Sequence, residues 1–145
     1  MPQLTSPAYV DSVFHEASYT GLVWLSGAIS NHETIRYGEP TYGLSDPLFV
    51  FVEGLNWFAQ AVRSGVVTYF EATSPERQAA MYAGLQRMNA PTGFVKQYRM
   101  GMEHHDDAAA MARLDQWHDE NDEKNNAFLW LLAGENRAAI EPLLP

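Results

Sequence analysis

Apolar residues recur along most of the chain at intervals of three and four, the spacing that places them on one side of an α-helix. The clearest run predicts a helix from about Pro47 to Ser64 and consists of Leu48, Phe51, Val52, Leu55, Phe58, Ala59 and Val62. Shorter runs occur before and after it, at Val10–Ala17, Leu22–Ile29, Ala79–Met88, Phe94–Met102, Ala110–Trp117 and Phe128–Ala133. The pattern predicts an all-α fold of about six to eight helices.

Capping residues and breakers indicate where several of these helices begin and end. Ser6-Pro7 and Ser74-Pro75 each combine an N-cap residue with a proline at the first helical position. Asp106 or Asp107 is expected to open the helix that follows them. Gly21 is expected to interrupt the first helical region.

Two segments depart from helical spacing. Asn31–Asp46 contains several glycine, proline and serine residues and is predicted as a long loop packed on the domain. Val66–Phe70 has the composition of a strand. Because it is flanked by predicted helices and has no obvious partner strand, a short helix or turn is favoured there.

Length and composition narrow the class of protein. The 145 residues contain no linker-like segment, so residues 1–145 are expected to form one domain. The absence of cysteine excludes disulfides, thiolate metal ligands and a cysteine nucleophile. No apolar stretch approaches the ~20 residues that cross a bilayer, and Met1–Ser6 show no signal-peptide pattern. A cytoplasmic protein without membrane contact is expected.

The formal net charge of −9 makes direct binding of nucleic acid phosphates implausible. A field of one sign attracts partners of the other, so a basic protein is the expected partner. Acidity of this kind is also compatible with a role in solubility alone.

Parts of the chain resemble the family DUF4375, a domain of unknown function. The similar segments are Glu53–Gln60, Arg63–Phe70, Leu85–Pro91 and Leu114–Leu132, and the residues that match directly are Gly65, Tyr69, Phe70, Ala90 and Pro91. The resemblance implies an all-helical, non-enzymatic protein. It also implies a possible homodimer that imitates DNA and engages a DNA-binding protein.

Acidic residues are concentrated between Glu103 and Glu123. Eight acids and one base, Arg113, give this segment a net charge of −7. On one continuous helix, four of these carboxylates would form a stripe: Asp115, Asp119, Asp122 and Glu123. Like charges four residues apart destabilise a helix by about 0.2–0.5 kcal/mol per pair. The predicted partner-binding residues are Glu103, Asp106, Asp107, Asp115, Trp117, Asp119, Asp122 and Glu123.

These observations favour an acidic interaction protein that docks on a basic surface. A DNA- or RNA-binding protein, or a nuclease held by its immunity protein, would supply such a surface, and the interaction could imitate nucleic acid and inhibit the partner. A solvated acidic helix and a structural subunit that dimerises through an apolar face are the alternatives. No enzymatic activity and no cofactor are expected.

An enzymatic alternative comes from the histidines. Imidazole and carboxylate are ligands for zinc, iron or manganese, and a metal-dependent hydrolase would use His104, His105, Asp106 and His118. The spacing matches no established metal motif. Glu16 and Glu53 lie in apolar helical segments and are candidates for buried carboxylates.

Overall fold

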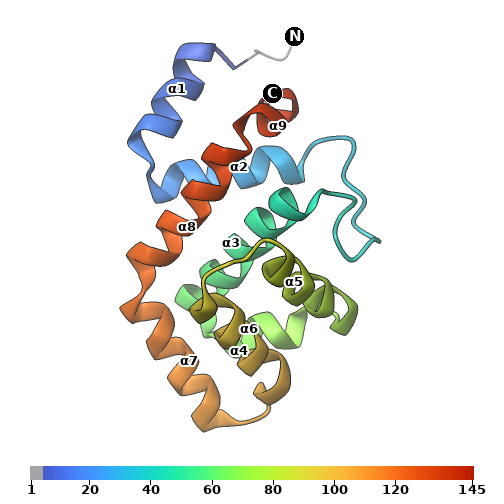
Figure 1. Cartoon of the computed structure of the whole chain (residues 1–145), viewed down its shortest axis with the longest axis vertical. Helices are drawn as coiled ribbons and strands as arrows, with labels where there is room; N and C mark the ends of the chain where they lie inside the picture. Colours follow the sequence, from blue (N-terminus) through green and yellow to red (C-terminus); the bar gives the residue numbers. More distant parts are fainter. Residues whose placement is uncertain (1–4) are drawn as a thin grey trace.

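The computed structural model describes residues 5–145, which form α-helices joined by short turns and one longer loop (Figure 1). In chain order these are α1 (Pro7–Glu16), α2 (Tyr19–Ser30), α3 (Asp46–Ser64), α4 (Val66–Ala72), α5 (Pro75–Arg87), α6 (Thr92–His104), α7 (Ala108–Glu120), α8 (Asp122–Glu135), α9 (Arg137–Ile140) and a final 3-10 turn, η1 (Glu141–Leu143). The all-α prediction is confirmed. The described residues hold nine α-helices, one above the predicted range, and α9 has only four residues.

Several local predictions are confirmed. Ser6 and Ser74 cap α1 and α5, each accepting a hydrogen bond from a backbone N–H of the first turn. Asp107 caps α7, and the Val66–Phe70 segment is helical. None of the helices in residues 5–145 combines the length and apolar character that crossing a membrane requires. Residues 1–4, part of the segment expected to lack a signal peptide, lie outside the described residues.

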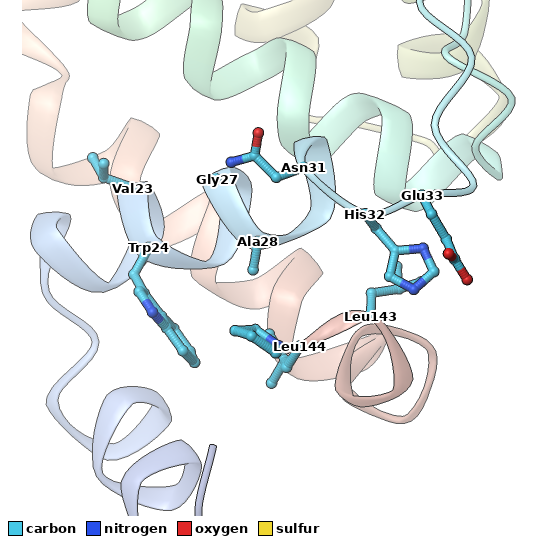
Figure 2. A pocket seen from close by; sticks show the side chains of 10 residues that line it. Val23, Trp24, Gly27, Ala28, Asn31, His32, Glu33, Leu143 and Leu144 are labelled. Carbon is cyan, nitrogen blue, oxygen red and sulfur yellow. The ribbon is translucent and has the colours of Figure 1, made fainter. Parts of the chain in front are cut away.

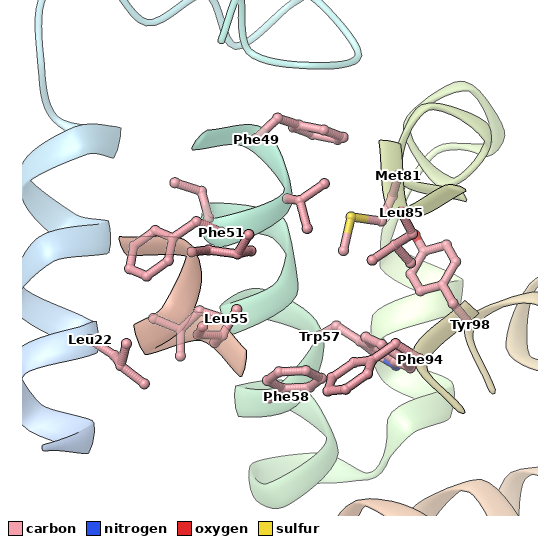
Figure 3. Close-up of a cluster of buried hydrophobic side chains, with 14 of the residues drawn as sticks. Leu22, Phe49, Phe51, Leu55, Trp57, Phe58, Met81, Leu85, Phe94 and Tyr98 are labelled. Carbon is pink, nitrogen blue, oxygen red and sulfur yellow. The ribbon is translucent and has the colours of Figure 1, made fainter. Parts of the chain in front are cut away.

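Helix α3 forms the centre of the fold because its first half is enclosed on every side. Its residues 48–55 are all buried, as are Trp57 and Phe58, and a helix with apolar residues all round is stable only when other elements enclose it. Helices α2, α4, α5, α7 and α8 all pack against it. Figure 3 shows Phe51 and Leu55 on the side facing Leu22 of α2, with Met81 and Leu85 of α5 on the other side.

The first helical region breaks at Ala17, so the expected break at Gly21 is wrong. Ala17 adopts a left-handed conformation (φ 48°), and the Ser18 hydroxyl accepts a hydrogen bond from the Gly21 N–H at 3.0 Å. Gly21 lies inside α2, where a Cβ would be 2.9 Å from the Trp130 ring. The serine cap therefore decides the break, and the glycine permits close contact with α8.

A second close contact, between α6 and α4, gives a test of the packing. A Cβ on Gly101 would lie 2.0 Å from a ring carbon of Phe70. We expect Gly101→Ala to lower the free energy of unfolding by about 1–3 kcal/mol, the usual effect of overpacking, as measured by chemical denaturation.

Gly93→Ala in the same helix is the control, since a Cβ there meets nothing within 4 Å. It is expected to leave stability unchanged or raise it by up to about 1 kcal/mol, because alanine favours helix. Equal effects of the two substitutions would contradict the described contact.

Candidate functional site

The predicted stripe of carboxylates is divided between two helices. Helix α7 ends at Glu120, Asn121 leaves the helical conformation (φ −118°, ψ 18°), and α8 begins at Asp122. The side-chain amide of Asn121 donates to the Trp117 carbonyl at 2.9 Å, which satisfies a backbone acceptor at the end of α7. The expectation of a single helix carrying Asp115, Asp119, Asp122 and Glu123 is therefore wrong.

Three predicted interface carboxylates have partners within the chain. Asp107 accepts hydrogen bonds from the N–H groups of Ala109 and Ala110. Glu103 forms an exposed ion pair with Arg99 at 2.7 Å. Asp115 accepts a hydrogen bond from a backbone N–H of another helix.

Asp115 acts as the N-cap of a helix that is distant in sequence. Helix α4 begins after Gly65, which has φ 90° and no side chain to accept a backbone hydrogen bond. The Asp115 carboxylate of α7 instead accepts the Val66 N–H at 2.7 Å. It supplies both the missing acceptor and a negative charge at the positive end of the helix dipole.

Trp117 belongs largely to the core. Its ring stacks on Trp57 with a centroid distance of 5.8 Å and meets the Phe94 ring edge-on at 5.7 Å. The side chain is half-buried, so only part of its surface is accessible to a partner.

The carboxylates on either side of Asn121 have a different environment. Asp119, Glu120, Asp122 and Glu123 are all exposed, and none takes part in an ion pair in the described part of the chain. Glu120 accepts one hydrogen bond, from Gln116. We refer to these four residues as the junction surface. Asp106 is also exposed but lies at the opposite end of α7, about 20 Å away for a helix of this length.

The histidines of the hydrolase alternative have separate surroundings. His105 stacks on Phe70, and His104 is exposed beside Glu103. His118 is buried among the rings of Trp57, Phe58 and Trp117. Over residues 5–145, no group of three or more histidine, aspartate or glutamate side chains is placed to hold a metal ion.

A buried carboxylate lies in the middle of α3. Glu53 is 1% exposed, whereas Glu16, the other candidate, is exposed. One Glu53 oxygen accepts the Tyr42 hydroxyl at 2.7 Å and the other accepts the Tyr69 hydroxyl at 2.5 Å. Because Tyr69 donates its proton to Glu53, Tyr98 donates to the Tyr69 oxygen at 2.8 Å.

These tyrosines remain protonated donors. Burial raises the pKa of Tyr42 well above its ordinary value, and the neighbouring Glu53 charge raises it further. Burial is also the main cause of the raised pKa of Tyr69, followed by the effects of Tyr98 and Glu53. The network is thus a carboxylate held by neutral phenols, in charge-assisted hydrogen bonds.

The carboxylate forms part of the wall of a small cavity, which we call the Glu53 cavity. It has a volume of about 170 Å³ and is lined by Tyr42, Glu53, Asn56, Gln60, Tyr69, Ala72, Thr73 and Arg77. A second cavity of about 210 Å³ shares Tyr42, Asn56 and Arg77 with it and lies under the loop at residues 31–45.

Arg77 of α5 holds this loop in place. Its guanidinium donates to the backbone carbonyls of Tyr37, Glu39 and Pro40 at 3.0–3.1 Å. The same group lies over the Tyr42 ring, 4.2 Å from the centroid, as a cation–π contact. The predicted packing of this loop on the rest of the protein is confirmed.

An apolar groove of about 800 Å³ lies between α2 and the C-terminal turn. Figure 2 shows Trp24 and Ala28 of α2 on one side, with Leu143 and Leu144 opposite. His32 and Glu33 lie at one end. The groove offers contact area, whereas the Glu53 cavity offers converging polar groups.

Comparisons with protein-family models, with curated proteins and with solved structures give no match to this chain. The resemblance to DUF4375 therefore stays a prediction.

The cap provided by Asp115 can be measured directly. We expect Asp115→Ala to lower the free energy of unfolding by about 0.5–2 kcal/mol, the usual effect of losing an N-cap. Asp119→Ala on the same helix is the control and is expected to change it by less than about 0.5 kcal/mol. A loss for Asp119→Ala as large as for Asp115→Ala would contradict the assigned role.

His118 makes stability depend on pH. Burial lowers the pKa of His118 from 6.5 to about 4, so the unfolded chain takes up a proton at a higher pH than the folded protein. This contribution to stability is complete above pH 6.5 and is lost as the pH falls toward 4. Between pH 7 and pH 5 the loss is about 2 kcal/mol.

Denaturation of His118→Phe should show a smaller decrease between pH 7 and pH 5 than that of the wild type. His15→Gln, at an exposed histidine, is the control and should retain the full decrease. If His118→Phe retained it too, another group would have to be responsible.

Proposed function

We propose that the protein is an acidic interaction module that binds a basic partner protein through the junction surface. The observation that carries the proposal is that Asp119, Glu120, Asp122 and Glu123 are exposed, adjacent and without ion-pair partners in the described residues. Lys124 is the one base among residues 119–124. Their mutual repulsion is relieved when a cationic surface approaches.

The position of Asp119 and Glu120 gives the proposal further support. Asp119 and Glu120 lie in the last turn of α7, where the helix dipole disfavours negative charge. Asp122 and Glu123 lie in the first turn of α8, where the dipole favours it. The stability of α8 therefore accounts for Asp122 and Glu123. The stability of α7 does not account for Asp119 and Glu120, and their presence favours a role in binding a partner.

The chemistry of the surface suggests the class of partner. A protein that binds DNA, RNA or another polyanion presents lysine and arginine side chains spaced for phosphates, and carboxylates can occupy the same positions. The net charge of −9 adds long-range attraction between the two proteins. We therefore propose a nucleic-acid-binding protein or nuclease as the partner, inhibited by occupation of its basic site.

Four residues of the predicted interface have roles within the protein itself. Asp107 and Asp115 cap helices, Glu103 is paired with Arg99, and Trp117 is half-buried against the core. Glu120, absent from the predicted interface, joins it because it is adjacent and exposed.

The test is affinity capture of partners from a lysate of the source organism. The bait is either the purified wild-type protein or the quadruple variant Asp119→Asn, Glu120→Gln, Asp122→Asn, Glu123→Gln. We expect a basic, nucleic-acid-binding protein to be retained by the wild type at low salt and released at high salt, because salt screens exposed charges. The quadruple variant should lose this retention while its thermal unfolding stays close to that of the wild type. Added wild-type protein should displace nucleic acid from the captured partner.

The control removes four other exposed acids, with Glu16, Glu33, Glu71 and Glu135 each changed to glutamine. It carries the same net charge as the quadruple variant and should still capture the partner. Equal loss in both variants would mean that net charge alone is responsible. Retention by the junction variant would rule out the proposed surface.

A further inference from the structure

The Glu53 cavity brings together one acid and one base, and neither has an ion-pair partner. Glu53 is almost fully buried, and the hydrogen bonds to its two oxygens come from neutral phenols. Arg77 forms no ion pair in the described residues, and the hydrogen bonds that it donates go to backbone carbonyls. Removing a carboxylate from water without an opposite charge is strongly unfavourable, so the site favours a ligand that supplies one.

The carboxylate has capacity for such a ligand. Each carboxylate oxygen has two lone pairs, and each Glu53 oxygen accepts one hydrogen bond, from Tyr42 or from Tyr69. The two phenols hold the carboxylate in a fixed position. An ammonium group in the cavity could therefore form short, charge-assisted hydrogen bonds without moving the protein.

The base is also held in position. Three hydrogen bonds to the loop and the contact with the Tyr42 ring fix the guanidinium plane of Arg77. Because Nε and Nη2 donate to these loop carbonyls, Nη1 is the group of the guanidinium that is left to donate to the carboxylate of a ligand. A ligand with only a positive charge would be attracted by Glu53 and repelled by Arg77. A ligand with only a negative charge would be attracted by Arg77 and repelled by Glu53.

Size and polarity limit the ligand further. A volume of about 170 Å³ corresponds to roughly five or six water molecules at ~30 Å³ each, which suits a small metabolite. Asn56 and Gln60 add amide groups to the wall, and Asn56 and Ala72 are exposed, which leaves a route to solvent.

The backbone of Tyr42 adds an independent observation. Tyr42 has a φ of 56°, a left-handed conformation that is unfavourable for a bulky residue. Loop hydrogen bonds hold this backbone, from the Tyr42 N–H to the Glu39 carbonyl and from the Arg36 N–H to the Tyr42 carbonyl. The side chain is thereby directed to Glu53 and Arg77. Strain of this kind is concentrated in proteins at ligand sites, where a side chain must be held at one position.

We propose that the Glu53 cavity binds a small zwitterion of the α-amino-acid class, with its ammonium group at Glu53 and its carboxylate at Arg77. The site is separate from the junction surface and does not depend on the function proposed for that surface.

The first experiment is thermal unfolding of the wild-type protein with each of the common L-α-amino acids at millimolar concentration, followed by calorimetric titration of those that stabilise it. We expect at least one to raise the melting temperature, because a ligand that binds only the folded state stabilises it. Butylamine and butyrate, which carry one charge each, should bind at least about tenfold more weakly. No stabilisation by any amino acid, or equal binding of butylamine or butyrate, would overturn the proposal.

The variants identify the site. Glu53→Gln keeps the shape of the side chain but removes its charge, and we expect the dissociation constant to rise at least about tenfold. If Glu53→Gln does not fold, Gln60→Leu on the cavity wall provides the test, with Gln86→Leu as the control at an exposed glutamine of α5. Weaker binding to Gln60→Leu but not to Gln86→Leu supports the site. Unchanged binding to Gln60→Leu, or to a folded Glu53→Gln protein, overturns it.

Discussion

The burial of a carboxylate in the centre of α3 is the interaction on which much of the surrounding structure depends. Every neighbour of Glu53 along that helix, from Leu48 to Leu55, is buried as well. The helix therefore cannot turn the acid toward water without exposing apolar surface on the other side. The protein instead brings hydroxyl groups to the acid, from the loop through Tyr42 and from α4 through Tyr69, which α6 supports through Tyr98. One loop and two helices therefore meet around a single residue.

Much of the fold could be predicted from the sequence because local signals specify it. Helical spacing predicted the central helix to within a residue of its observed start, and serine–proline pairs predicted two other helix starts. The breaks at Ala17 and Asn121 were missed for a common reason. Neither residue is a strong breaker, and each break is accompanied by a side-chain hydrogen bond to the backbone, from Asn121 itself or at Ser18 beside Ala17. Hydrogen bonds of this kind between side chain and backbone are weakly encoded in apolar spacing.

The candidate sites were less accessible to sequence reasoning. The acidic segment was visible as composition, but composition could not separate Asp115, which caps a helix 49 residues earlier in the chain, from Asp119, which faces solvent. Glu53 could be recognised as a candidate buried acid, since it lies within an apolar helix. Its partners could not, because Tyr42 and Tyr69 are brought to it by a loop and by a turn between helices. The position of Arg77 over Tyr42 likewise follows from the tertiary fold.

The cap that Asp115 gives to α4 has a consequence for the order in which the protein folds. Helix α4 has seven residues, too few for an isolated helix to be stable in water. Its cap becomes available only after a segment of 49 residues has closed on itself, and such closure carries an entropic cost that local helices avoid. The stability that α4 gains from this cap is therefore acquired only once α7 is in place, whereas its packing on the adjacent α3 needs no such closure. The Tyr69 hydroxyl that donates to Glu53 belongs to α4, so the polar centre of the molecule shares the stability that this distant cap gives to the helix.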